Sequence, residues 1–302
     1  MSAREIITLL ELGLAYAILS MGVFVTFRVL DTPDLTTEGS FTLGAAVSAA
    51  LALGGHPALG LLLGFAAGAL AGLCTALLMT RGRVQPILTG ILVMTGLYSV
   101  NLFVMGGKSN LPLMRVDTVF TPMEALVPGG WHRVALLALL VSLLGVGLCV
   151  FFRSSLGLSV RATGDNERMV RASSISTDVT KAVALCLANG LCALSGAVVA
   201  QAQQFTDISM GMGTVLVALA SLILGETLLR GGGIPRGMLS AVVGSVLYRA
   251  IVALVLKTSI PAYAVKLMTA LLVAAAVLQP TLARALTLAR AKRKEARRHA
   301  AH

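Results

Sequence analysis

The chain alternates between long apolar runs and short polar connections. Nine apolar runs follow one another, at residues 6–29, 41–53, 57–79, 87–105, 134–152, 182–202, 213–224, 238–256 and 262–278. A helix needs about 20 apolar residues to cross the hydrocarbon core of a bilayer, and several runs reach that length. The pattern predicts an all-α fold, a polytopic membrane bundle of about eight to ten transmembrane helices.

Composition supports a lipid-facing surface. Of the 302 residues, 57% are hydrophobic and 12% are charged, whereas a soluble domain carries about a quarter charged residues. We expect one transmembrane domain over residues 1–283 and a basic cytoplasmic tail over residues 284–302. The first run follows no basic stretch and no cleavage site, so it is interpreted as a retained span.

The distribution of Lys and Arg predicts an orientation. Alternating sides from a cytoplasmic tail places 17 of the 24 basic residues inside and five outside, with Arg249 and Lys266 within runs. Cytoplasmic loops carry an excess of Lys and Arg. The chain is therefore predicted to lie in the inner (plasma) membrane with its N-terminus outside and its C-terminus in the cytoplasm.

The net charge of +11 has a topological explanation, so no nucleic-acid partner is expected. The tail would lie against anionic lipid headgroups, or serve simply as a topological anchor.

Glycines recur every fourth residue in the third run, at Gly60, Gly64, Gly68 and Gly72. Small residues on one helix face allow close backbone approach. We expect packing within the chain here, in preference to a subunit interface.

The first informative polar segment covers residues 31–40. It places Asp34, Glu38 and Ser40 next to a run of 13 residues that is too short to cross a bilayer alone. One interpretation is a broken second helix that lines a translocation pathway; the other is a surface loop.

Arg249, in the eighth run, is expected to face the interior and pair with a carboxylate or backbone carbonyls. Structural pairing is favoured there over contact with the solute.

The second polar segment, residues 154–178, is a predicted cytoplasmic loop. Gly164-Asp165-Asn166 is a turn signal, with Asp165 or Asn166 as an N-cap, and a short amphipathic helix is expected from Glu167 to about Ser173. Such a helix could dock on a partner, or simply lie at the membrane surface.

The third segment, residues 211–244, contains Gly231, Gly232 and Gly233 before a proline, and the chain must turn there. Glu226 and Arg230 are spaced four apart, which suits an ion pair.

The sequence contains no motif for chemistry of its own. It has no GxxxxGK[ST] loop for ATP and no HExxH, and its four histidines are scattered. The cysteines, Cys74, Cys149, Cys186 and Cys192, all lie in apolar runs without a CxxC pair. We expect no catalytic residues, no metal site and no cofactor, and energy for any pumping must enter through another subunit.

Three stretches resemble the branched-chain amino acid and ribose permease family. They are LELGLAYAILSMGVFVTFRVLD with PDLTTEGSFTLGAAVSA, then GLSVRATGDNERMVRASSIS, then LASLILGETLLRGGGIPRGMLSAVVGSVL. Together they cover most of the chain in the family's order. The subgroup that the chain resembles most works with a binding protein for aromatic amino acids such as tryptophan or tyrosine.

The resemblance implies a type II ABC importer permease. Its partners would be cytoplasmic ABC ATPase subunits, an extracytoplasmic substrate-binding protein and a second permease copy, in a homodimer or a pseudo-symmetric pair. It implies that Arg161, Gly164, Asp165 and Asn166 lie at or beside the helix that couples to the ATPase, which begins with Glu167 and Arg168. The TTEGSF stretch departs from the asparagine-rich equivalent in the family, which leaves the solute open.

Two other functions fit parts of the pattern. A secondary transporter driven by an ion gradient would need carboxylates in several spans and an internal repeat; only Glu38 and Glu11 qualify. A membrane scaffold without transport would need neither. Copurification of an ATPase would separate these alternatives from the importer.

Overall fold

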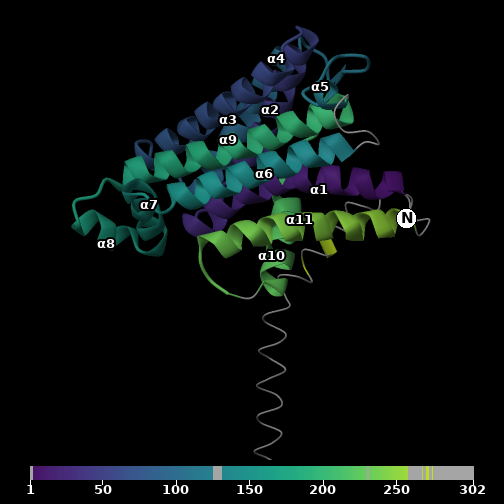
Figure 1. The fold of residues 1–302 in the computed structure, drawn as a ribbon. Coiled ribbons are helices and arrows are strands. Elements are labelled where there is room, and N and C mark those ends of the chain that lie inside the picture. Colours follow the sequence, from purple (N-terminus) through teal and green to yellow (C-terminus); the bar gives the residue numbers. More distant parts are fainter. Residues whose placement is uncertain are drawn as a thin grey trace, which may run out of the picture.

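A computed structural model describes residues 3–124, 131–229 and 231–257, together with positions 267, 270, 271 and 274. Most of the described chain is helical (Figure 1). The elements are α1 (Ala3–Phe24), the π-helical turn η1 (Val25–Val29), α2 (Thr36–Leu53), α3 (Pro57–Thr80), α4 (Pro86–Val104), β1 (Asn110–Pro112), α5 (Thr121–Glu124), α6 (Trp131–Phe151), α7 (Ser155–Asp165), α8 (Glu167–Ala172), α9 (Thr177–Gln203), β2 (Phe205–Asp207), α10 (Thr214–Leu228) and α11 (Ile234–Leu256). Apart from those four positions, the ninth apolar run and the tail, with Lys266, lie outside the described residues.

Within the described residues, six helical segments are long and apolar enough to cross a membrane. They are Arg4–Val29, Pro57–Thr80, Pro86–Val104, Trp131–Phe151, Thr177–Gln203 and Ile234–Val255. Two further helices belong to the bundle: α2 has 18 residues and α10 has 15. The predicted helical membrane bundle is confirmed.

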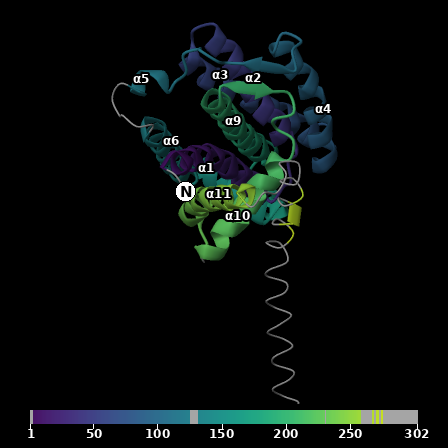
Figure 2. The ribbon, with the colours of Figure 1, turned by 90° about the vertical axis from the view of Figure 1, so that its right-hand side faces the viewer.

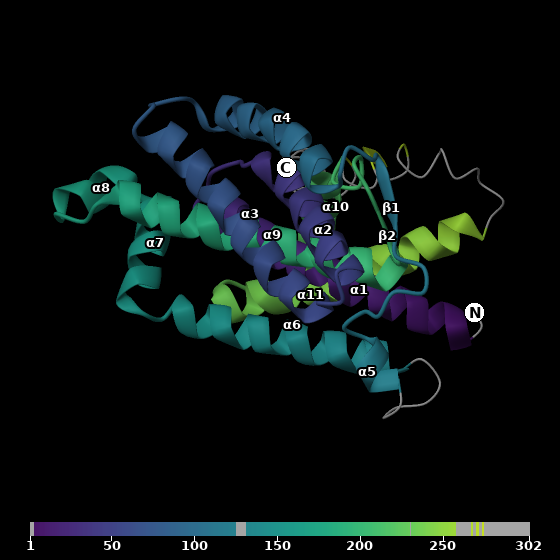
Figure 3. The same cartoon turned by 90° about the horizontal axis from the view of Figure 1, so that it is seen from above.

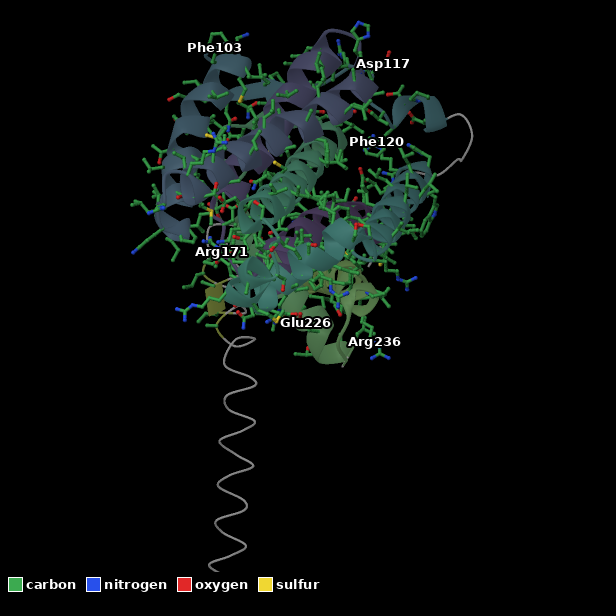
Figure 4. The ribbon with its side chains drawn as sticks, turned by 90° about the vertical axis from the view of Figure 1, so that its left-hand side faces the viewer. Phe103, Asp117, Phe120, Arg171, Glu226 and Arg236 are labelled. Carbon is green, nitrogen blue, oxygen red and sulfur yellow. The ribbon has the colours of Figure 1, made fainter. Side chains whose placement is uncertain are left out.

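Helix α9 lies at the centre of the bundle. It packs against α3, α2 and α1, and Figure 2 shows it between α2 and α3 on one side and α1 and α6 on the other. In its apolar window 78% of the residues are buried, against 17% in α6. The most hydrophobic faces of α3, α4 and α6 therefore point outward, as expected for lipid contact. Phe103 of α4, 85% exposed, lies at the periphery (Figure 4).

Proline and glycine set the helix boundaries. Pro57, Pro86 and Pro235 occupy the first turns of α3, α4 and α11, where the missing amide hydrogen costs nothing and the ring fixes a helical φ. Gly55, with φ of +81°, lies in the turn between α2 and α3, a backbone angle that side chains with a Cβ rarely adopt.

The glycine stripe of α3 packs within the chain, as predicted. Gly60 faces α2, Gly64 lies against both α2 and α9, and Gly68 and Gly72 face α9. A Cβ on Gly72 would lie 2.3 Å from the carbonyl oxygen of Leu185, so only glycine allows this approach. Helices in lipid gain little from hydrophobicity against one another, so close backbone contact supplies their attraction.

The two ends of the bundle differ. Strands β1 and β2 pair antiparallel at the end that carries α5 and the N-terminus (Figure 3). The opposite end carries α7, α8 and the connection between α3 and α4 (Figure 3).

We predict that Gly44→Ala destabilises the bundle by at least about 2 kcal/mol, within the range for overpacked cores. A Cβ at Gly44 would lie 1.9 Å from the carbonyl oxygen of Ala193, which forces α2 and α9 apart. Thermal unfolding of the purified protein in detergent measures the loss. Gly96→Ala is the matched control, because a Cβ there meets nothing within 4 Å; equal melting temperatures for the two variants would contradict the packing described.

Candidate functional site

The polar segment of residues 154–178 folds into two short helices. Asn166 forms the joint between α7 and α8 with an extended backbone (φ −160°), and its Oδ1 accepts a hydrogen bond from the Met169 amide at 3.1 Å. Of the two predicted N-cap candidates, Asn166 is therefore the cap of α8. The expected short helix is present over Glu167–Ala172.

Helix α7 was not predicted. Gly164 and Asp165, expected in a turn, are instead the last residues of this 11-residue helix, so the turn prediction was wrong for them. The buried positions Gly157, Val160 and Thr163 recur every third residue, a spacing that places them on one helix face. That spacing was the available signal, and the polar composition of the segment obscured it.

The outer face of α7 and α8 is exposed and amphipathic. Arg161, Asp165 and Arg168 are exposed, and two apolar side chains stand among them: Leu158 is 50% exposed and Met169 is 55% exposed. We call these five residues the docking face. Its mixture of charge and apolar surface is typical of a protein contact.

The opposite side of α8 is held to the start of α9 by charge. Glu167 Oε1 accepts hydrogen bonds at 2.8 Å from Arg171 and from Lys181. Arg171 Nε also donates to Thr177 Oγ1 at 2.9 Å. Figure 4 views the molecule from the end that carries α7 and α8 and labels Arg171. The hydrogen bond from Lys181, with that from Arg171, holds the pKa of the Glu167 carboxyl below its ordinary value.

Helix α7 also contacts the end of α1 without an intervening side chain. A Cβ on Gly164 would lie 1.9 Å from the carbonyl oxygen of Val29, in the π-helical turn η1. That turn closes through a hydrogen bond of 2.9 Å from the Leu30 amide to the Val25 oxygen. Single π-turns inside α-helices are frequent at functional sites. Of the six predicted coupling residues, Gly164 thus has a direct structural route into the bundle.

A groove of about 390 Å³ lies beside this contact. Arg161 and Asp165 line it on the α7 side, with Arg28 and Glu226 among its other walls. Arg28 Nε donates to Glu226 Oε1 at 3.0 Å, and Arg28 Nη2 donates to Glu226 Oε2, so the ion pair is bidentate. The sequence favoured Arg230 as the partner of Glu226; Arg230 lies outside the described residues, and Arg28 was missed because it is 198 positions away.

The segment before α2 begins at the surface, with Asp31 and Pro33 exposed, and enters the protein at Asp34. Asp34 is 1% exposed; its Oδ1 accepts the Thr36 amide at 2.8 Å and its Oδ2 accepts from Asn189 Nδ2 at 2.7 Å. Ser40 Oγ donates to Asn189 Oδ1 at 2.7 Å, and Thr36 and Thr75 share a hydroxyl contact of 2.8 Å. We call these residues the central network. Within it the Asp34 carboxylate satisfies the Thr36 amide in the first turn of α2, because a buried backbone donor in a membrane protein needs a partner inside the protein.

Glu38 lies apart from the central network. Its Oε1 accepts the Gly213 amide at 3.0 Å at the start of α10, a favourable place for a carboxylate because helix N-termini carry partial positive charge. Helix α2 includes Glu38, as the broken-helix interpretation expected. Among the predicted pathway residues Glu38 lines a cavity, whereas Asp34 and Ser40 are enclosed by protein.

Arg249 lies elsewhere, on α11 against α1. Its guanidinium carbon is 3.8 Å from the centroid of the Tyr16 ring, a cation–π contact. The expected carboxylate partner is not found among the residues that the structure describes. The structure therefore joins Asp34 and Ser40 in one network, and leaves Arg249 and Glu38 outside it. Asn189, which connects that network, was missed because a single asparagine within a largely apolar run has no distinguishing spacing.

Comparison with known proteins identifies the family. The family model for the permease component of the branched-chain amino acid transport system matches residues 5–276. The chain belongs to this family.

Curated relatives of this chain include permease proteins of transport and import systems. It is 33% identical over 271 residues to a tyrosine transport system permease protein of Clostridioides difficile, which covers 89% of each chain. It is 28% identical over 266 residues to the autoinducer 2 import system permease protein LsrC of Yersinia pestis, covering 87% of this chain and 70% of the relative. No solved structure gives a significant match. The chain is thus a multi-pass membrane protein, the permease subunit of an ATP-binding-cassette importer.

We predict that Glu167→Gln loosens α8. Because the folded-state pKa of Glu167 is lowered, its contribution is present above the ordinary value of 4.5 and is lost as pH falls through the lower folded value. Hydrogen exchange at pH 7 should show protection of the α8 amides reduced by up to about fivefold, the scale of partly exposed ion pairs. The same loss should appear in the wild type on acidification.

Asp178→Asn is the control, because Asp178 approaches Arg171 only to 3.9 Å. Protection in α8 that is unchanged by Glu167→Gln, or reduced as much by Asp178→Asn, would contradict the role of Glu167.

Proposed function

We propose that this permease imports an aromatic amino acid as a homodimer in the plasma membrane, with two cytoplasmic ATPases bound at the docking faces. A binding protein delivers the solute at the end that carries β1, β2 and α5. ATP-driven closure of the ATPases moves α7 and α8, and the bundle then switches the side to which its pathway opens. The observation that carries the proposal is an exposed docking face whose helices contact the bundle interior directly.

The charge distribution supports this orientation. The α7–α8 end holds Arg153, Arg161, Arg168 and Arg171, and such clusters mark cytoplasmic connections. The N-terminus then lies outside, and the C-terminus, with its basic tail, lies in the cytoplasm against anionic lipid. The aromatic amino acid is proposed from the tyrosine transport relative.

The ion-gradient alternative finds little support in the spans. Glu11 of α1 is bonded to Arg133 at 3.3 Å, and Glu38 accepts the Gly213 amide. Arg133 already balances the charge of Glu11, which leaves less electrostatic attraction there for a proton or a sodium ion.

The proposed function is tested by uptake of radiolabelled L-tyrosine into proteoliposomes that contain the permease, its ATPase and the binding protein. Uptake should require both ATP and the binding protein. Uptake that persists without ATP and follows an imposed ion gradient would contradict the proposal and favour a secondary transporter.

The docking face makes a separate prediction. Arg168→Glu combined with Met169→Glu should reduce copurification of the ATPase by at least about tenfold, about 1.4 kcal/mol of binding free energy. Both side chains are exposed in the described structure, so the fold should tolerate the change. Lys108→Glu, exposed at the opposite end, is the control. If this variant lost as much ATPase as the double variant, or if the double variant lost none, the ATPase would bind at a different surface.

Gly164→Ala should uncouple the importer. The added Cβ cannot fit against the Val29 carbonyl, so α7 separates from η1 while the docking face stays intact. We expect the ATPase to remain bound and active while uptake per ATP hydrolysed falls by at least about tenfold, because transmission depends on this contact. Gly147→Ala, with no atom within 4 Å of its Cβ, should transport normally. Normal uptake by Gly164→Ala would remove the contact from the coupling route.

A further inference from the structure

A cavity with a mainly apolar lining and a few polar groups opens between α2, α4 and the connection from β2 to α10. Its volume is about 320 Å³, near the lower end of the range of about 300–1,000 Å³ for small-molecule sites. Glu38, Thr42, Tyr98 and Asn101 contribute to its lining. Polar groups such as these would be costly against lipid, so this side of the bundle is suited to a water-filled pathway or a second copy of the chain.

Asn101, one of the residues that line this cavity, carries an unsatisfied hydrogen-bond acceptor. The residue is 2% exposed, and its Nδ2 donates to the Gly39 carbonyl at 3.3 Å. Its Oδ1 accepts no hydrogen bond from any residue in the described part of the chain. The reversed amide would place two oxygens together, so the Gly39 contact fixes Oδ1 as the free group. A buried acceptor without a donor is unfavourable because it has lost its hydrogen bonds to water, and a ligand that donates there restores one.

The rest of the cavity favours a cation. The Glu38 carboxylate lines it, as does the ring of Tyr98, which is 49% exposed. Aromatic faces attract ammonium groups. None of the described lining residues is Lys or Arg. Met94 and Met212 complete an apolar wall, and thioether side chains adapt to varied apolar shapes.

We infer that this cavity binds the ammonium group of the transported solute. Asn101 Oδ1 accepts from it, Glu38 balances its charge, and the apolar or aromatic body of the solute packs against Met94 and Met212. This inference rests on the proposed function as an aromatic amino acid permease and adds which end of the solute the membrane subunit recognises. Because none of the described lining residues is a cation, we expect the solute carboxylate to add little to binding here.

Site-directed labelling tests the inference on the intact permease in detergent. With the four native cysteines replaced by alanine, Met212→Cys provides a reporter within the cavity, and Leu216→Cys provides one outside it, in the first turn of α10. Three probes are compared for slowing of maleimide labelling: L-tyrosine, tyramine, and 3-(4-hydroxyphenyl)propionate. We expect tyrosine and tyramine to protect Met212→Cys, tyramine at least as well as tyrosine, while the deaminated acid protects neither reporter.

Asn101→Leu and Glu38→Gln should each weaken protection by tyramine by at least about tenfold, the scale of a charge-assisted hydrogen bond. Unfolding temperature is measured for each variant; should Asn101→Leu fail to fold, Glu38→Gln decides alone. Equal protection by the deaminated acid, no protection by either amine, or protection unchanged in Glu38→Gln would overturn the inference.

The labelling experiment measures solute binding to the permease alone, without ATP or partner proteins. A negative result there therefore counts against this binding site and leaves the proposed transport function to be decided by the uptake experiment. A permease that imports tyrosine with ATP but shows no amine protection keeps the function and loses this site.

Discussion

Close backbone contact between helices is the constraint on which this fold depends. Lipid removes the hydrophobic force that would otherwise hold helices together, and α2, α3 and α9 meet instead through glycines that bring carbonyl groups against the neighbouring backbone. The central network of Asp34, Asn189 and Ser40 can form only because the helices are this close. The packing thus comes first, and the buried polar contacts follow from it.

The same principle connects the docking face to the interior. Gly164 brings α7 onto the backbone of η1, and five residues further along the chain Asp34 enters the central network. Glu167 joins α8 to the N-terminal part of α9 through Lys181, and α9 carries Asn189. Two routes therefore lead from one surface to the same buried cluster, and rigid helices transmit displacement along both.

Much of this arrangement follows from patterns that are local in the sequence. Run lengths predicted the spans, the glycine stripe of α3 predicted its packing, and the residues around Asn166 predicted the start of α8. Contacts between distant residues were out of reach: Asp34 and Asn189 are 155 positions apart, and no periodicity selects that pair. The orphaned acceptor of Asn101 is likewise a property of three-dimensional packing, since an asparagine near the end of an apolar run has no distinguishing spacing.

The π-helical turn η1 determines how the segment after α1 is rotated about the helix axis. A π-turn holds one residue more than an α-turn in each hydrogen-bonded ring, so restoring ordinary spacing there would rotate the following chain by about 100°. Such a rotation would carry Asp34 away from Asn189 and leave a carboxylate facing apolar neighbours. The extra residue at the end of α1 therefore sets the orientation of the following segment that brings Asp34 to the side-chain amide of Asn189.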